Sequence, residues 1–174
     1  MNEDKILLEG FKSGNPKSFE NLIIKYRQKG INFAKKYLHD YYLAEDIVQE
    51  SFAEIYVYRD RYDPKYSFKS YLYSIIRNKS VDYIRKNHSI PVKEISLTTE
   101  DTPEKSFFNK DRKNTVIEKI NQMKMDYRMA IYLVEYEELS YKEIAKIMNK
   151  NMTQVKILIY RARKKLKNLL EGEV

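Results

Sequence analysis

The sequence predicts an all-α protein in which a flexible linker joins two small helical domains. Gly and Pro each occur four times in 174 residues, so few positions break a helix. Lys, Glu, Ile and Leu are abundant, and apolar residues recur at helical spacing over two long segments. Between these segments, two prolines and the stretch SLTT interrupt the periodicity. We expect domains at residues 1–88 and 115–174, with a linker at 89–114.

Composition restricts the class of function. The formal charge of +8 suits a nucleic-acid partner but is weak evidence alone. There is no Cys, only His39 and His88 could act as imidazole bases, and the four glycines are too scattered for a phosphate-binding loop. The longest run without a charge, Ser70 to Ile76, is far shorter than a membrane span, and the N-terminus has no signal-peptide core. We expect a cytoplasmic protein that is not an enzyme and needs no cofactor, metal or small-molecule substrate.

The first domain should contain an acidic helix. From Leu38 to Tyr58 there is no Lys or Arg. Glu50 and Glu54 are like charges at i,i+4, which is unfavourable in an isolated helix. This acidity indicates either a docking surface for a basic protein or a solvated face that is balanced by bases elsewhere. The expected buried stripe of this helix is Ile47, Val48, Phe52 and Ile55.

The following helix, Lys65 to Lys86, has the opposite charge, with six bases and one acid, Asp82. Tyrosines lie between the bases, a mixture typical of proteins that bind single-stranded nucleic acid, because bases stack on the rings. The chain has sixteen Tyr, however, so for any one of them a position at the edge of the core is the favoured interpretation. The expected core positions are Phe68, Leu72, Ile75, Ile76 and Ile84.

The second domain should open with two short helices. Thr115 and Glu118 have the spacing of a capping box, in which two side chains satisfy backbone donors at a helix start. Asp126 is the expected N-cap of the next helix.

A helix-turn-helix follows. Ser140 and Glu143 form another expected capping box, and Asn149 accepts the left-handed conformation that ends many helices. Ala145, Asn149 and Val155 match the small residue, turn residue and apolar anchor of this motif. The ordinary alternative is a helical hairpin with a basic solvated face.

The second helix of this motif indicates a polyanionic partner. Lys150 to Leu170 contains seven Lys or Arg and no acid, whereas a solvated structural helix normally mixes both signs. Its apolar side should be buried against the domain. The opposite side carries Lys156, Tyr160, Arg161 and Lys164.

These blocks resemble bacterial sigma factors of the extracytoplasmic-function type. The resemblance lies in LAEDIVQESF (Leu43 to Phe52), SFKSYLYSIIRNKSVDYIRK (Ser67 to Lys86) and YKEIAKIMNKNMTQVKILIYRARKKL (Tyr141 to Leu166). It extends from about Phe19 to Leu170, with the motifs in the family's order and separation. It implies an alternative sigma factor that binds core RNA polymerase and directs promoter recognition, opening and transcription initiation.

The resemblance also assigns partners and site residues. Asp46, Gln49 and Glu50 match the residues that dock on the clamp helices of the polymerase's largest subunit. A membrane-bound anti-sigma factor is a further expected partner, holding the protein inactive until a stress releases it. The linker would thread toward the polymerase active-site channel.

Promoter DNA, duplex and melted, is the other implied partner. The loop from Asp60 to Tyr66 matches the place where the family captures a flipped base. The residues expected at the minus-ten element are Asp60, Arg61, Tyr62, Tyr66, Lys69, Arg77, Asn78, Lys79, Asp82 and Arg85. Those expected at the minus-thirty-five element are Asn151, Thr153, Lys156, Tyr160, Arg161, Arg163 and Lys164.

The chain departs from the family pattern at three places. Tyr71 stands where the family usually has Trp, and we expect packing there to be kept. Asn149 replaces the usual turn Gly, at small cost because Asn accepts that conformation. Ile157 and Leu158 stand where many members have Ser and Arg, so base readout by this helix is the assignment least supported by the resemblance.

Two other functions remain open from the sequence. A stand-alone helix-turn-helix regulator would explain the C-terminal third but leave the acidic helix and the Tyr-rich basic helix without a role. An enzyme acting on nucleic acid would need clustered metal-binding carboxylates. The acids from Asp40 to Glu54 are instead spaced along a helix, and His39 is the only other candidate metal ligand near them.

Overall fold

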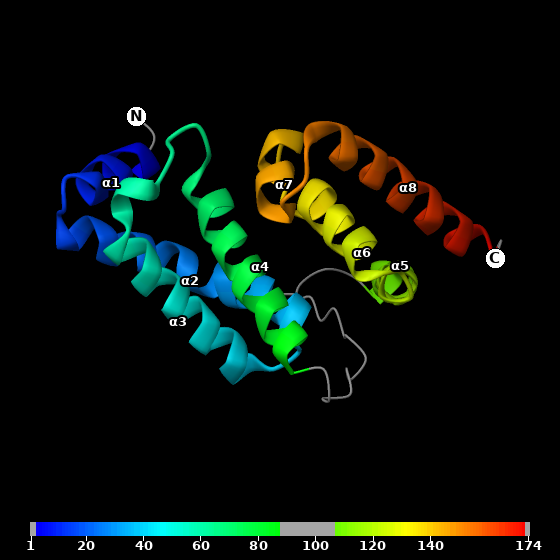
Figure 1. Ribbon diagram of the computed structural model, residues 1–174. Helices are drawn as coiled ribbons and strands as arrows, with labels where there is room; N and C mark the ends of the chain where they lie inside the picture. Colours follow the sequence, from blue (N-terminus) through cyan, green and yellow to red (C-terminus); the bar gives the residue numbers. More distant parts are fainter. Residues whose placement is uncertain (1–2, 88–106, 173–174) are drawn as a thin grey trace. The chain divides into compact units, whose positions relative to one another are not determined.

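The computed structural model describes residues 3–87 and 107–172, and within these ranges it consists of helices without strands (Figure 1). The main helices are α1 (Glu3–Lys12), α2 (Pro16–Leu38), α3 (Tyr41–Val57), α4 (Phe68–Lys86), α5 (Phe107–Asn121), α6 (Met125–Ile131), α7 (Tyr141–Met148) and α8 (Met152–Glu171). A 3-10 turn, η1 (Arg59–Arg61), follows α3, and a π-helical turn, η2 (Tyr132–Tyr136), continues α6. The all-α prediction is confirmed. None of these helices is long and apolar enough to cross a bilayer.

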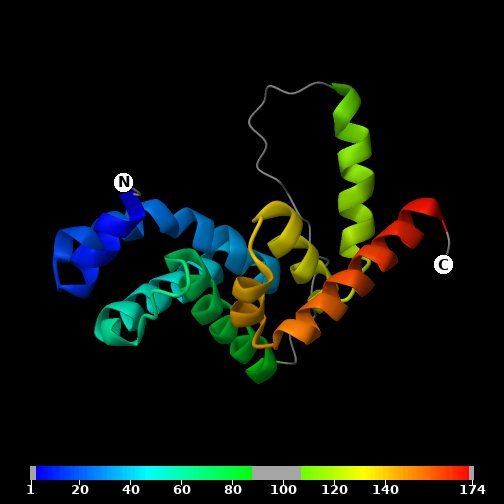
Figure 2. The ribbon, with the colours of Figure 1, turned by 90° about the horizontal axis from the view of Figure 1, so that it is seen from above.

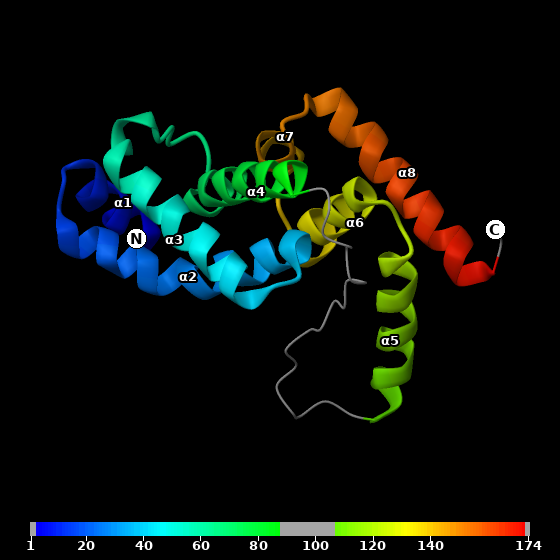
Figure 3. The ribbon, with the colours of Figure 1, turned by 60° about the horizontal axis from the view of Figure 1, so that its bottom comes forward.

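The chain forms two compact units. Helices α1 to α4 build the first, in which α2, α3 and α4 all pack on one another and α2 and α3 run side by side (Figure 3). Polar side chains cap the N-termini of three of these helices. Asn15 accepts from the Lys17 N–H at 3.0 Å, Asp40 from the Leu43 N–H at 2.9 Å, and Ser67 from the Ser70 N–H at 3.2 Å.

The core of the first unit lies between these helices. The predicted stripe of α3, Ile47, Val48, Phe52 and Ile55, is buried, as predicted. On α4 the predicted core residues Phe68, Leu72 and Ile76 are also buried. The predictions for Ile75 and Ile84 are only partly right, because both side chains stay half-exposed at the edge of the helix contact.

Two further features bring the helices of the first unit close together. The ring of Tyr73 is fully buried and stacks on Phe33 of α2, with 4.1 Å between centroids and 3° between planes. At Gly30 of α2, an added Cβ would lie 3.1 Å from Ile76 Cδ1 and 3.3 Å from Val48 Cγ1. The side chains of Ile76 and Val48 would therefore have to shift by a few tenths of an ångström to admit a Cβ at residue 30.

Helices α5, α6 and α8 build the second unit, and α7 leads into α8 through a short turn. Helix α6 packs along α8, and α5 also contacts α8 (Figure 2). Met123, Ile131 and Ala162 form a buried cluster here. The residues packed around this cluster are Ile120, Tyr127, Leu166 and Leu169.

Two predicted helix starts in the second unit are wrong. Helix α5 begins at Phe107, so Thr115 lies inside a helix and not at its start. Nothing between Phe107 and Asn114 breaks a helix, since Gly and Pro are both absent there. Helix α6 begins after Lys124 without a side-chain cap, and Asp126 lies in its first turn, where a negative charge suits the helix dipole.

Only part of the predicted linker lies among the described residues. Its residues 89–106, like His88 before it, lie outside the described residues. The remaining predicted linker residues, 107–114, belong to α5.

Candidate nucleic-acid interface and acidic docking surface

The predicted docking residues lie together on the outside of α3. Asp46, Gln49 and Glu50 are exposed, and their i,i+3,i+4 spacing places them on one face of the helix. The buried stripe of the same helix fixes this orientation, because Ile47 and Val48 point into the core. The result is a solvent-facing surface with two carboxylates and one amide.

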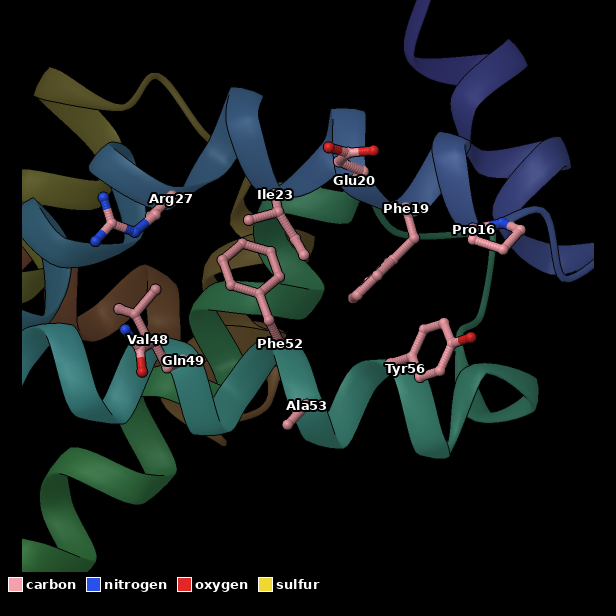
Figure 4. A pocket seen from close by; sticks show the side chains of 10 residues that line it. All are labelled: Pro16, Phe19, Glu20, Ile23, Arg27, Val48, Gln49, Phe52, Ala53 and Tyr56. Atoms are coloured by element: carbon pink, nitrogen blue, oxygen red, sulfur yellow. The ribbon is translucent and has the colours of Figure 1, made fainter.

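An apolar groove between α2 and α3 adjoins this surface (Figure 4). Its lining is Pro16, Phe19, Glu20, Ile23, Arg27, Val48, Gln49, Phe52, Ala53 and Tyr56. Gln49 thus belongs both to the predicted docking residues and to the groove. Sequence reasoning missed the groove because half of its lining comes from α2, and no pattern within one helix indicates which residues of a neighbour lie opposite.

Two of the positive charges of α4 lie near carboxylates within the first unit. Lys79 Nζ lies 3.0 Å from Glu54 Oε2 and 3.9 Å from Glu50 Oε2, which joins α4 to the acidic helix. Arg85 lies 3.7 Å from Asp82 on the same helix. Arg77 donates to the side-chain oxygen of its neighbour Asn78 at 3.3 Å.

The loop before α4 combines exposed and buried residues of the predicted minus-ten set. Asp60 and Arg61 are exposed in η1, and the Arg61 guanidinium lies 3.9 Å from the centroid of the Tyr58 ring. Tyr62 is only 5 % exposed, and its hydroxyl donates to the Tyr66 carbonyl oxygen at 2.8 Å. Burial raises the pKa of the Tyr62 hydroxyl. The burial of Tyr62 gives no support for a DNA contact by its ring, and its hydroxyl instead holds the loop to the Tyr66 carbonyl.

The remaining residues of this set lie on or beside α4. Tyr66 and Lys69 are half-exposed near its start, and Asn78 and Asp82 are exposed further along. Tyr71, at a position where the resemblance leads us to expect Trp, lies with its ring 5.3 Å from that of Tyr62. An aromatic contact is therefore present at that position.

The helix-turn-helix has the local geometry that its sequence predicts. Glu143 accepts from the Ser140 N–H at 3.2 Å, and Ser140 Oγ accepts from the Glu143 N–H at 3.3 Å. Asn149 has φ of 52°, and the Lys150 N–H donates to the Ala145 carbonyl at 3.0 Å, as in a Schellman motif. Val155, the expected anchor, is fully buried. Both the capping box and the left-handed turn are confirmed.

Helix α8 presents the predicted cations to solvent. Its buried side is formed by Val155, Ile159 and Ala162. The exposed residues of the predicted minus-thirty-five set on the helix are Thr153, Lys156, Tyr160, Arg161, Arg163 and Lys164. In the described part of the chain, no ion pair involves Lys156, Arg161 or Lys164, so these three cations are available to an external anion.

Two predicted minus-thirty-five residues have roles inside the second unit. Arg163 lies 2.8 Å from Glu135 Oε1 through Nε and 2.7 Å through Nη2, and this hydrogen-bonded carboxylate raises the pKa of the guanidinium. Asn151 caps α8, accepting from the Gln154 N–H at 2.8 Å while Gln154 accepts from the Asn151 N–H at 2.9 Å. Within residues 3–87 and 107–172, no cluster of three or more acidic, His or Cys side chains could hold a metal ion.

Comparison with known proteins matches both units. Residues 22–90 match the family model of Sigma-70 region 2, and residues 113–166 match that of Sigma-70, region 4. The ECF RNA polymerase sigma-E factor of Salmonella typhimurium strain LT2 is 30% identical, over 97% of this chain and 94% of that protein. The RNA polymerase sigma-H factor of Pseudomonas aeruginosa is 27% identical, over the same shares of the two chains, 97% and 94%.

Two solved structures share the fold. The sigma factor RpoE of Bartonella quintana, in complex with the anti-sigma factor NepR, matches with a TM-score of 0.69 at 23% identity, over 89% of this chain and 98% of that one. CnrH, in complex with the cytosolic domain of CnrY, matches with a TM-score of 0.68 at 23% identity, over 98% and 99%.

The fold and the matches over both units define a bacterial transcription initiation factor of the sigma-70 type. The chain belongs to the extracytoplasmic-function sigma factors, the alternative sigma factors that direct transcription initiation by RNA polymerase.

Proposed function

We propose that this sigma factor docks on core RNA polymerase through the outer face of α3. The observation that carries the proposal is the exposed group of Asp46, Gln49 and Glu50, in a stretch without any base, beside an apolar groove. The carboxylates suit a basic helical partner, and the groove suits its apolar side chains. The clamp helices of the polymerase's largest subunit are the partner that the family implies.

Reversing charge on this face tests the proposal. The double variant Asp46→Lys/Glu50→Lys should weaken binding to core polymerase about tenfold, since two surface ion pairs become repulsive contacts. A matched control, Glu9→Lys/Glu118→Lys, makes the same charge change at exposed acids of α1 and α5. Affinity measured by fluorescence anisotropy that is equal for both double variants would exclude docking through α3.

We propose that α4 and the preceding loop bind the melted minus-ten element. Asn78 is exposed on α4, and Tyr66 ends the loop that the related proteins use to hold a flipped base. Unstacking and unpairing a base costs a few kcal/mol, which the protein must return through aromatic and polar contacts. Alanine at either residue should therefore impair promoter opening more than core binding.

Permanganate reactivity of unpaired thymines measures this opening. On a closed duplex promoter, Asn78→Ala should reduce reactivity in the minus-ten region. On a template with a pre-melted minus-ten bubble, much of the loss should disappear because the opening energy is already supplied. Equal defects on both templates would instead indicate impaired folding or polymerase docking.

We propose that α8 enters the major groove of the duplex minus-thirty-five element. Lys156, Arg161 and Lys164 support this role because their charges are exposed and not offset within the described chain. Footprinting separates it from the alternative of a stand-alone helix-turn-helix regulator. Such a regulator protects its site unaided, whereas a sigma factor needs core polymerase for promoter-specific protection.

We also propose an inhibitory protein partner and a cytoplasmic location. The two solved relatives were each captured with a second protein, named as an anti-sigma factor for one of them, and this supports an anti-sigma partner here. We propose that a membrane-bound anti-sigma factor holds the chain until a stress signal, and that the chain acts by binding without being an enzyme. Co-purification from native cells, tested for core polymerase and for a membrane protein, checks both partners.

A further inference from the structure

One apolar side chain lies in the middle of the outward face of α8. Ile157 is 45 % exposed in the second turn of the helix. It contributes little to the core, which α8 meets through its opposite side. Its neighbours at i−4, i+3, i+4 and i+7 share its face, because helical residues at these spacings line up. These exposed neighbours are Thr153, Tyr160, Arg161 and Lys164.

The surroundings of Ile157 indicate what would cover it. Arg161 and Lys164 are free of ion pairs in the described part of the chain, so their charges complement an anion. A helix that enters the major groove holds its first turns against base edges while cations further along reach phosphates. In that position Ile157 faces the edges of the bases.

The side chain of Ile157 limits which features of a base pair can be recognised at that position. It has no hydrogen-bond donor or acceptor, so it cannot distinguish the polar patterns of base edges. The apolar group that base edges present in the major groove is the 5-methyl group of thymine. Tyr160 shares the face, but the outer end of its side chain is a hydroxyl, which favours polar contacts.

We propose that Ile157 contacts a thymine 5-methyl group and thereby selects an A·T pair at one position of the duplex that α8 binds. This inference rests on the proposed binding of α8 to duplex promoter DNA. It assigns a specificity-determining role to a residue at which the chain departs from many of its relatives.

Replacing thymine by deoxyuridine tests the contact, because uracil pairs like thymine but lacks the methyl group. The full chain, alone and with core polymerase, is used to enrich duplexes from a randomised pool. Each thymine of the enriched duplex is then replaced in turn. For the wild-type protein, one replacement should weaken binding about fourfold, the value of one buried methyl group. In Ile157→Ser, the same replacement should have no effect.

Leu170→Ser is the matched control. Leu170 is also 45 % exposed on α8 but lies thirteen residues further along, about 20 Å away. This variant should keep the fourfold discrimination. Circular dichroism and the salt dependence of DNA binding should be unchanged in Ile157→Ser, which shows that the helix still folds and still binds phosphates.

The outcomes separate this inference from the function on which it rests. Enrichment of a duplex without any methyl effect, or a methyl effect that Ile157→Ser retains, overturns the role of Ile157 while DNA binding by the chain stands. If neither the chain nor its complex with polymerase enriches a duplex, the duplex-binding function fails and the inference fails with it.

Discussion

Helices α4 and α8 are both basic, but they hold their charges differently. In α4, Lys79 is paired with Glu54 of α3, and Arg85 is paired with Asp82. In α8, Lys156 and Lys164 face solvent, and no ion pair within the described residues involves them. Free cations release condensed counterions when they meet phosphates, whereas paired cations already have a counter-charge. We therefore expect the unpaired cations of α8 to contribute more to binding the duplex backbone than the two paired cations of α4.

The tyrosines of the two helices show the same division. Tyr73 of α4 is fully buried against Phe33, while Tyr160 of α8 is 67 % exposed. The sequence alone therefore does not indicate whether a Tyr beside Lys and Arg is buried or exposed. Its role depends on which side of the helix the rest of the unit covers.

The largest expected effect concerns this pair of tyrosines. Tyr73→Ala should lower the free energy of unfolding of the first unit by about 3–5 kcal/mol, because it removes a stacked, buried ring. Tyr160→Ala should change stability by no more than about 0.5 kcal/mol. Urea unfolding followed by circular dichroism measures both. Tyr73→Phe, which keeps the ring, is the control, and equal losses in the two alanine variants would contradict the comparison.

The next effect is on the salt dependence of duplex binding. Replacing Lys156, Arg161 and Lys164 by Ala should flatten the slope of log affinity against log salt by about 2.7, at 0.9 per phosphate contact. The matched α4 triple variant replaces Arg77, Lys79 and Arg85. It should flatten the slope by no more than about 1, because Lys79 and Arg85 already have carboxylate partners and only Arg77 has none among the described residues. Equal changes in the two variants would mean that intramolecular pairing does not distinguish the helices.

Releasing one paired cation should make α8 bind phosphate more strongly. Glu135→Gln removes the carboxylate that holds Arg163 and should steepen the salt slope by up to about 0.9. Glu138→Gln makes the same charge change at a nearby exposed acid and controls for net charge. If both variants bind DNA alike, the Arg163–Glu135 pair does not restrain Arg163.

The smallest expected effect is at the ion pair between α3 and α4. Lys79→Met should lower the stability of the first unit by less than about 1 kcal/mol, since the pair is only partly shielded from water. Because salt screens such pairs, the difference from wild type should shrink at high ionic strength. Urea unfolding at low and high salt checks this, and a loss that does not depend on salt would indicate packing by the lysine stem instead.

Local signals in the sequence were reliable where the structure depends on neighbouring residues. The capping box of Ser140 and Glu143 forms as predicted, and Asn149 adopts the left-handed conformation as predicted. Both features depend only on residues a few positions apart in the chain. The same kind of signal was wrong at Thr115, where the helix simply continues through the capping pattern. A capping box marks a helix start only when the residues before it leave the helix.

Roles of single side chains in the candidate sites were harder to predict. Asp46 and Glu50 were grouped through the family resemblance, and their i,i+4 spacing does place both on one exposed face of α3. Whether a charge on that face is free depends on another helix. Glu135 lies 28 residues from Arg163 in the chain, and nothing in the local sequence of α8 indicates that pair.

The sequence by itself determined the helices, their charged and apolar faces, and the membership of the chain in the extracytoplasmic-function sigma factors. The helices and their faces follow from periodicity and composition, which local physical chemistry controls, whereas the membership rests on the resemblance of the motifs to the family. Only the tertiary structure decided that Tyr62 is buried, that Lys79 and Arg163 are paired, that α2 and α3 enclose an apolar groove, and that Ile157 is exposed. Burial and ion pairing depend on residues that are distant in the chain, and packing brings those residues together.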